Sequence, residues 1–236
     1  MDIDTALVIA GGEGTRLKPL TDNMPKHLIQ VNGKPVIEHI VRELARNGIK
    51  RIFVSVGYKA EMIIDFFNNF KIEGVVIECI KETEKLGTGG AIKNALKNFE
   101  WKNDVLALWG DNLFRFDLRK MYEVHNSNKS LITFGLVEVD DVSGYGVVEM
   151  QGDRITRFLE KPDPKQVVSK LINCGIFILN EKIVSEFPED KAFSMEKQVF
   201  EKAVVNSTVC GFNIGKEWYP TDNMERYKNA IENWKY

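Results

Sequence analysis

The sequence lacks the features that mark several large classes of protein. No apolar run approaches the roughly 18 residues of a membrane-spanning helix, and Met1–Asp4 has neither the basic patch nor the apolar core of a secretory signal. The three cysteines lie far apart without a Cys-x-x-Cys pair, so we expect free thiols and a cytoplasmic location. Lys plus Arg (32) nearly equals Asp plus Glu (34), which argues against a nucleic-acid binder with a basic stripe.

The first half of the chain alternates between two patterns. Runs rich in Val and Ile are followed by stretches of helical spacing, such as the apolar positions of residues 36–44. With 44% hydrophobic and 28% charged residues over 236 positions, this is the composition of an ordinary globular protein. The alternation predicts a mainly parallel sheet with helices on both faces. The expected strands are residues 5–10, 51–56, 74–80 and 104–109, and the expected helices are 35–46, 60–70 and 88–98.

The second half consists mainly of strand-like runs joined by short connectors. Gln151-Gly152-Asp153 reads as a hairpin turn, and two short helical stretches follow Asn180. Because no linker or repeat separates the halves, we predict one α/β domain over residues 1–236, in three layers with a mixed, mainly parallel sheet. Its halves are residues 1–112 and 113–236. The expected strands of the second half are 130–139, 146–150, 154–159, 171–179 and 207–214, and a helix is expected at 223–234.

A glycine-rich loop, Gly11-Gly12-Glu13-Gly14-Thr15-Arg16, follows the first expected strand. Glycines let backbone N–H groups approach an anion closely, and such a loop suits phosphates. The loop is not a Walker A motif, and Leu17 stands where a dinucleotide fingerprint needs glycine, which disfavours an NAD-dependent dehydrogenase. Arg16 and Lys26 supply a bidentate fork and a compact charge that would neutralise a triphosphate. The alternative is an ordinary tight turn with solvated charges.

This loop, continued by Leu17, Pro19-Leu20-Thr21 and Pro25-Lys26, resembles the opening of the sugar-1-phosphate nucleotidyltransferases, or NDP-sugar pyrophosphorylases. The resemblance implies their Rossmann-like fold, with a nucleotide-binding first half and a sugar-phosphate-binding second half. It also implies transfer of a nucleotidyl group from a nucleoside triphosphate to a sugar 1-phosphate, with release of pyrophosphate. Nearly the whole chain carries matching segments in the family's order, namely Leu86-Gly87-Thr88-Gly89-Gly90-Ala91, Gly110-Asp111-Asn112, Tyr145-Gly146-Val147-Val148-Glu149, Glu160-Lys161-Pro162 and Asn173-x-Gly175.

The resemblance further implies roles for single residues. Arg16 and Lys26 are the expected catalytic residues. The expected nucleotide-binding residues are Ala10, Gly11, Gly12, Gly14, Thr15, Glu82, Gly87 and Thr88. The expected sugar-phosphate-binding residues are Gly146, Glu160, Lys161 and Asn173. For Glu160 and Lys161 the alternative is a surface ion pair of little energetic value. Members of the family are often dimers or tetramers, so a homo-oligomer stays open for this chain.

Two aspartates are the expected ligands of Mg²⁺. Asp111 follows a strand, at the edge where open α/β sheets bind ligands, and the matching aspartate binds the metal in the family. Mg²⁺ is commonly held by one or two carboxylates together with substrate phosphates. Many relatives carry the second carboxylate two residues after a tryptophan, where this chain has Pro220. The run 218–222 is instead similar to the glucose-1-phosphate cytidylyltransferases, which makes Asp222 the expected second ligand. The alternatives are an Asp-Asn turn at Asp111 and a helix N-cap at Asp222.

The base and the acceptor stay open at this point. Glu82 stands where thymidylyltransferases have glutamine, and a carboxylate, which only accepts hydrogen bonds, suits the amino groups of guanine or cytosine. Residues 86–92 are similar to heptose- and mannose-1-phosphate guanylyltransferases, residues 220–222 to cytidylyltransferases, and residues 146–149 to thymidylyltransferases. Two other functions remain: a cytidylyltransferase of a non-sugar phosphate acceptor, and a non-catalytic regulatory relative that binds nucleotide sugar.

Overall fold

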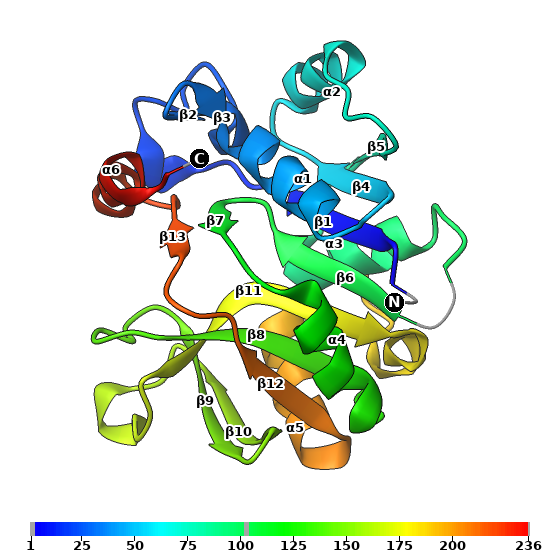
Figure 1. Ribbon diagram of the computed structural model, residues 1–236, viewed down its shortest axis with the longest axis vertical. Helices are drawn as coiled ribbons and strands as arrows, with labels where there is room; N and C mark the ends of the chain where they lie inside the picture. Colours follow the sequence, from blue (N-terminus) through cyan, green and yellow to red (C-terminus); the bar gives the residue numbers. More distant parts are fainter. Residues whose placement is uncertain (1–2, 102–103, 236) are drawn as a thin grey trace.

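The computed structural model describes residues 3–101 and 104–235 of the chain. One sheet runs through both halves of the sequence (Figure 1). Its strands are β1 (Thr5–Ala10), β4 (Arg51–Val56), β5 (Val76–Lys81), β6 (Asp104–Trp109), β8 (Ile132–Glu138), β9 (Gly146–Gln151), β10 (Arg154–Glu160), β11 (Leu171–Asn180) and β12 (Val209–Asn213). Their order across the sheet is β5-β4-β1-β6-β11-β8-β12-β10-β9. All run in one direction except β10 and β11, so the sheet is mixed and mainly parallel, as predicted.

Helices cover both faces of the sheet because each helix has one apolar side. The helices α1 (Val36–Arg46), α2 (Ala60–Asn69) and α4 (Leu118–Ser127) contribute to the core on one face. On the other face lie α3 (Gly87–Leu96) and α5 (Glu201–Asn206), behind the sheet in Figure 1. The predicted three-layer α/β arrangement is therefore confirmed. In α1 the buried residues follow the predicted helical spacing, and the chain turns away at Gly48, whose φ is +85°.

The first parallel strands end at a common edge of the sheet. β1 pairs with β4 so that Ala10 lies opposite Val56, and with β6 so that Ile9 lies opposite Trp109. The loops that follow β1, β4, β5 and β6 consequently meet at this edge. Ligands of open α/β sheets bind at the carboxyl ends of such strands, and the candidate site lies here.

Several elements were not predicted from the sequence. They are helix α4 and two short antiparallel ribbons, one of β2 (Gln30–Val31) and β3 (Lys34–Pro35), the other of β7 (Asn112–Phe114) and β13 (Trp218–Pro220). The expected helical stretches after Asn180 are η4 (Glu181–Glu186) and a π-helical turn, η5 (Glu196–Phe200), that continues into α5. The last helix is α6 (Met224–Asn233), and further single turns are η1 (Thr15–Leu17), η2 (Lys26–Leu28) and η3 (Pro164–Gln166).

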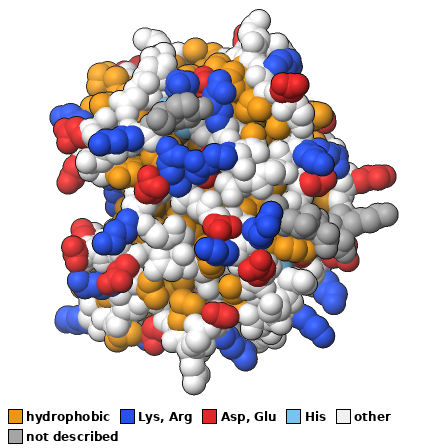
Figure 2. All heavy atoms as spheres, viewed as in Figure 1, with side chains coloured by type: hydrophobic (Ala, Val, Ile, Leu, Met, Phe, Trp, Pro, Cys, Tyr) orange, Lys and Arg blue, Asp and Glu red, His pale blue; other side chains and the backbone are white. Residues whose placement is uncertain are grey.

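The surface mixes both signs of charge. On the face drawn in Figure 2, Lys and Arg side chains lie among Asp and Glu side chains, as the balanced composition leads one to expect. Within residues 3–101 and 104–235, no helix has the length and apolar character needed to cross a membrane. The cytoplasmic location stays a prediction.

Candidate active site

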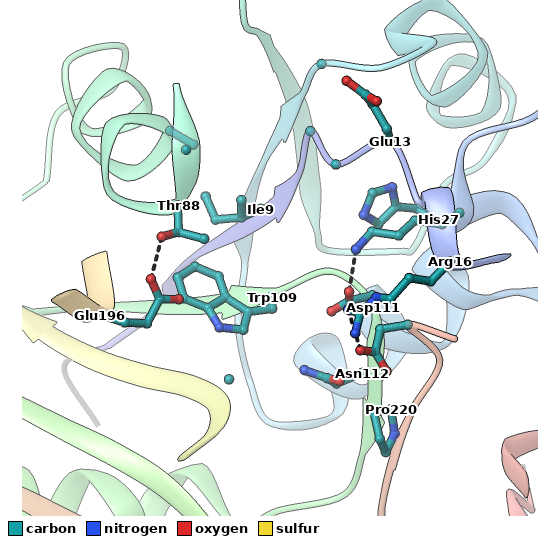
Figure 3. Close-up of a pocket in the computed structure, with 18 of the residues that line it drawn as sticks. Ile9, Glu13, Arg16, His27, Thr88, Trp109, Asp111, Asn112, Glu196 and Pro220 are labelled. Atoms are coloured by element: carbon teal, nitrogen blue, oxygen red, sulfur yellow. Dashed lines mark hydrogen bonds and ion pairs between the residues drawn. The ribbon is translucent and has the colours of Figure 1, made fainter. Parts of the chain in front are cut away.

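A cleft of about 520 Å³ opens at the carboxyl edge of β1 and β6 (Figure 3). It brings together residues from the glycine loop to the last helix. Nearly all of the predicted site residues line it; the exceptions are Ala10, Gly14 and Thr15. Ala10 is fully buried in the core, and Thr15 begins the helical turn η1. One cleft therefore holds the residues that the sequence assigned to the nucleotide, the sugar phosphate and the metal.

The glycine loop is shaped around the Lys26 side chain. Gly14 has φ +68°, a left-handed conformation that favours glycine, and its carbonyl accepts a 2.8 Å hydrogen bond from the Thr21 hydroxyl. A Cβ at Gly14 would lie 2.9 Å from Lys26 Cβ, and one at Gly12 would lie 3.4 Å from Lys26 Nζ. The loop is thus more than a tight turn, because its glycines make room for a cation at the wall of the cleft.

Lys26 forms an ion pair with Asp111 inside the cleft. Both side chains are largely buried, with 17% and 15% of their surfaces exposed. Burial alone would raise the pKa of Asp111, but the neighbouring Lys26 ammonium outweighs it and leaves that pKa below its usual value. Asp111 is therefore ionised at neutral pH. Asp111 lies in the turn that follows β6, and its carboxylate forms an ion pair with Lys26 from that turn, so its role as a metal ligand stays a prediction.

Asp222 reaches the same cleft through the β7–β13 ribbon. Pro220 pairs with Asn112, and the Asp222 carboxylate binds Arg16 at 2.7 Å and Arg226 at 3.0 and 3.1 Å. The alternative that Asp222 caps the last helix is wrong: the N-cap of α6 is Asn223, whose side chain accepts from the Arg226 amide at 3.0 Å. The carboxylate of Asp222 is consequently directed to the cleft and its cations.

The two aspartates suit a cation held jointly with a substrate. Asp111 and Asp222 line one cleft, and each is already matched by a cationic side chain, Lys26 or Arg16. Among the described residues no group of three or more His, Cys, Asp and Glu side chains is placed to hold a metal by itself. Two hard oxygen ligands completed by substrate phosphates are the usual protein contribution to a Mg²⁺ site, so the residues fit that ion.

Glu82 lines the cleft and is held in place from two sides. The fully buried Ser55 at the end of β4 donates a 2.8 Å hydrogen bond to Glu82 Oε1. A Cβ at Gly11 would lie only 2.6 Å from the same oxygen, so the carboxylate packs against the bare backbone of the glycine loop. Burial raises the pKa of Glu82, although the Ser55 hydrogen bond lowers it in part. Glu82 faces the cleft, as its proposed part in base choice requires.

The glycines of the 87–90 segment have a packing role that the motif did not reveal. A Cβ at Gly87 would lie 2.7 Å from the Phe193 carbonyl oxygen, one at Gly89 would overlap the Phe193 ring at 2.1 Å, and one at Gly90 would lie 2.2 Å from the Lys191 carbonyl oxygen. The Gly89 amide also donates to the Phe193 carbonyl at 2.9 Å. These glycines let the segment before η5 dock on the start of α3.

The residues predicted to bind the sugar phosphate gather at another part of the cleft. Lys161 Nζ lies 3.4 Å from the largely buried Glu160 carboxylate; both residues line the cleft, and the Lys161 side chain is 63% exposed at its rim. Burial raises the pKa of Glu160, and the charge of Glu196 raises it further. Asn173 Oδ1 accepts from the Gly175 amide at 2.8 Å. This part of the cleft therefore offers acceptors beside a lysine, a combination that suits hydroxyl groups and a phosphate.

Sequence reasoning missed several residues that line the cleft. Trp109 at the end of β6, Glu196 at the start of η5 and Arg226 in α6 are examples. His27, next to the predicted Lys26, is buried in the wall, and burial lowers its pKa to about 3, with Lys26 adding to the effect. His39, in contrast, is structural as expected: its Nε2 lies 2.8 Å from the Val31 carbonyl oxygen.

The cleft over β1 and β6 and the order of the sheet are those of a Rossmann-like transferase of nucleotides. The chain belongs to the nucleotidyl transferase family, whose model matches residues 5–234, and within it to the sugar-1-phosphate nucleotidyltransferases that its motifs predicted.

Known relatives place the chain near guanylyltransferases. It is 35% identical over 207 residues to D-glycero-alpha-D-manno-heptose 1-phosphate guanylyltransferase of Aneurinibacillus thermoaerophilus, covering 88% of each chain. It is 34% identical over 231 residues to probable mannose-1-phosphate guanylyltransferase 1 of Oryza sativa subsp. japonica, with 96% of this chain but 63% of the rice protein covered. The crystal structure of HddC from Yersinia pseudotuberculosis complexed with GMP-PN matches with a TM-score of 0.82 at 32% identity, covering 98% of this chain and 99% of the other.

Proposed function

We propose that the chain transfers a guanylyl group from GTP to a sugar 1-phosphate of the manno series, giving a GDP-sugar and pyrophosphate. The observation that carries this proposal is the shared cleft, which joins the glycine loop, the Lys26–Asp111 pair and the Glu160–Lys161 pair. A nucleoside triphosphate and a sugar phosphate bound there would lie next to each other. The manno acceptor is supported by the names of the heptose and mannose relatives.

The charges of the cleft suit this reaction. Arg16 and Lys26, each paired with an aspartate, would contact the triphosphate oxygens and stabilise charge on the leaving pyrophosphate. Mg²⁺, with Asp111 and Asp222 as its protein ligands, would supply positive charge that neutralises the triphosphate. Lys161 would hold the sugar phosphate, one oxygen of which attacks the α-phosphorus. The new phosphorus–oxygen bond forms as the bond to the β-phosphate breaks, and the electron pair leaves with pyrophosphate.

No general base is required, because a phosphate monoester is already an anion near neutral pH. The cleft therefore acts by positioning two anionic substrates and by stabilising charge. This agrees with its composition, since its described lining contains cations and carboxylates, and its buried histidine, His27, has a pKa of about 3 and is neutral.

The preference for guanine is argued from Glu82. Guanine presents an amino group and a ring N–H on its Watson–Crick edge, both of which donate hydrogen bonds, whereas uracil and thymine present two carbonyl groups there. The Glu82 carboxylate, oriented by Ser55, can only accept. The relatives named guanylyltransferases and the GMP-PN complex of the structural neighbour support the same base.

The test is pyrophosphate release with Mg²⁺ over a grid of substrates. ATP, GTP, CTP, UTP and dTTP are each combined with glucose, mannose, N-acetylglucosamine and manno-heptose 1-phosphates, and with choline phosphate. We expect the fastest release with GTP and a manno-configured acceptor. Preference for UTP or dTTP would refute the assigned base, and preference for choline phosphate would show a non-sugar acceptor. A blank grid, with nucleotide sugar bound in calorimetry, would establish a regulatory relative instead.

A further inference from the structure

Glu196 is a second carboxylate in the part of the cleft that holds Glu160. It comes from the start of η5, far in sequence from the motifs that carry the family resemblance, and it lines the cleft. Figure 3 shows Glu196 and Thr88 directed toward one another beside Trp109. No ion pair involves Glu196 within the described ranges, unlike the aspartates of the phosphate region.

The Glu196 side chain is held through one oxygen only. Oε2 accepts hydrogen bonds from the Thr88 hydroxyl at 2.7 Å and from the Ser194 hydroxyl at 2.6 Å. Each hydroxyl is itself oriented by a backbone amide, Thr88 by Met195 N at 3.0 Å and Ser194 by Lys197 N at 3.3 Å. Both hydroxyl hydrogens are thereby committed to Oε2. In the described part of the chain Oε1 has no hydrogen-bond partner, so it is a fixed and open acceptor.

Glu196 and Glu160 line the same cleft and lie close to one another in it. The two carboxylates are near enough for the charge of Glu196 to raise the pKa of Glu160, in addition to the effect of burial. Two carboxylates facing one space cannot satisfy each other, because neither donates a hydrogen bond in its charged form. A ligand that carries several hydroxyl donors removes this conflict, and a sugar ring is such a ligand.

We infer that Glu196 Oε1 accepts a hydrogen bond from a ring hydroxyl of the sugar 1-phosphate and so selects acceptors that keep this hydroxyl free. Glu196 is then a specificity residue alongside Glu160, positioned by Thr88 and Ser194. A deoxy sugar leaves this half-buried acceptor unpaired, and a substituent on the sugar oxygen removes the donor. This inference rests on the proposed transfer to a sugar 1-phosphate.

The test compares wild type with Glu196→Gln on the sugar 1-phosphate preferred in the substrate grid and on its monodeoxy analogues. The glutamine keeps an amide oxygen for Thr88 and Ser194 and replaces the free acceptor by a donor. For one analogue we expect wild-type kcat/KM to be about 10- to 100-fold below that of the parent sugar, as for a lost hydrogen bond to a charged group. In Glu196→Gln, kcat/KM for the parent sugar should fall by about the same factor, whereas kcat/KM for that analogue should not fall further. KM for the triphosphate should not change.

Glu196→Asp withdraws the carboxylate and serves as a second variant, with the same expected loss of discrimination. Glu189→Gln is the matched control, because this exposed acid lies on the preceding segment outside the cleft and should leave discrimination intact. The inference is overturned, while the proposed function stands, if both Glu196 variants discriminate between the parent sugar and its deoxy analogues as the wild type does. An equal loss of kcat/KM with every analogue overturns it as well. A wild-type chain that releases no pyrophosphate with any acceptor overturns the proposed function, and the inference with it.

Discussion

Thr221 binds the Asp111 carbonyl oxygen twice, through its amide at 2.9 Å and its hydroxyl at 2.8 Å. Thr221 is fully buried, and the contact joins two segments that are more than a hundred residues apart. Because Asp222 is the next residue, this contact sets the position of one predicted metal ligand relative to the other. The second carboxylate thus reaches the cleft even though proline occupies its usual place after the tryptophan.

Thr221→Val should separate this positioning effect from simple stability. Valine fills the same volume but cannot donate to the Asp111 carbonyl, so we expect a loss of about 1 kcal/mol in the free energy of unfolding. We expect a larger relative effect on pyrophosphate release, about tenfold or more in kcat/KM, because small displacements of reacting groups are costly. Urea unfolding and the release assay measure the two effects.

Thr5→Val is the matched control for that variant. Thr5 is also buried, at the start of β1, and its hydroxyl donates to Asp4 at 2.8 Å, far from the cleft. It should lose similar stability while keeping wild-type kcat/KM. Equal activities in the two variants would show that the Thr221 hydroxyl does not position Asp222.

Gly90→Ala should be strongly destabilising. A helix interior normally gains from alanine, but here the new Cβ would lie 2.2 Å from the Lys191 carbonyl oxygen. We expect a loss of about 2–3 kcal/mol as the docked segment is displaced. Gly74→Ala is the comparison, because Gly74 has φ +74° and open space around it. Backbone strain should lower the free energy of unfolding of this variant by only about 1 kcal/mol. Chemical denaturation of both variants tests the order; the reverse order would mean that the docking of Lys191 is loose.

The sequence predicted the first half of the sheet closely. The expected bounds of β1, β4 and β6 are those observed, because each strand is a mainly apolar run that begins at a polar residue, is buried on both faces and is followed by a glycine. Helix α4 was missed although Asp117 caps it and Leu118, Met121 and His125 share its buried face. Charged residues surround these positions and weaken the pattern. The three-residue strands β7 and β13 are too short to show any period.

The candidate site was predictable where loops follow strands and unpredictable where distant segments meet. Gly11, Asp111 and Glu82 follow β1, β6 and β5, so parallel topology brings them together. The hydrogen bond from Thr88 to Glu196, in contrast, depends on how the segment before η5 docks on α3. Nothing in the local pattern of either residue reports that contact, and Glu196 was consequently not among the predicted site residues.

His27 should make the fold less stable in acid. The unfolded chain takes up a proton on this residue near pH 6.5, whereas burial, reinforced by Lys26, lowers the folded-state pKa to about 3. Between these values the unfolded state binds more protons, so the free energy of unfolding decreases as the pH falls from about 6.5 toward 3, by up to about 1.4 kcal/mol per pH unit. Denaturation curves at several pH values measure this slope.

His27→Leu should flatten that dependence. Among the residues that the structure describes, none forms a hydrogen bond with the buried Nδ1 atom of His27, so an apolar residue of similar size loses no hydrogen bond at that position. Wild type and variant are compared between pH 7 and pH 4, and the slope of the variant should be smaller by as much as one proton. Parallel slopes would show that His27 titrates normally in the folded chain.

Glu82→Gln should change which base the cleft accepts. The glutamine side chain keeps an oxygen for the Ser55 hydroxyl, but its remaining group donates instead of accepting. With GTP, the donors of guanine then meet a donor, and we expect kcat/KM to fall by about 10- to 100-fold. With UTP or dTTP, a base carbonyl meets that donor, so kcat/KM for these triphosphates should stay unchanged or rise. Lys161 and Glu160 are untouched, so KM for the sugar 1-phosphate should stay at its wild-type value. An equal fall with every triphosphate would mean that Glu82 supports the glycine loop at Gly11 and does not contact the base.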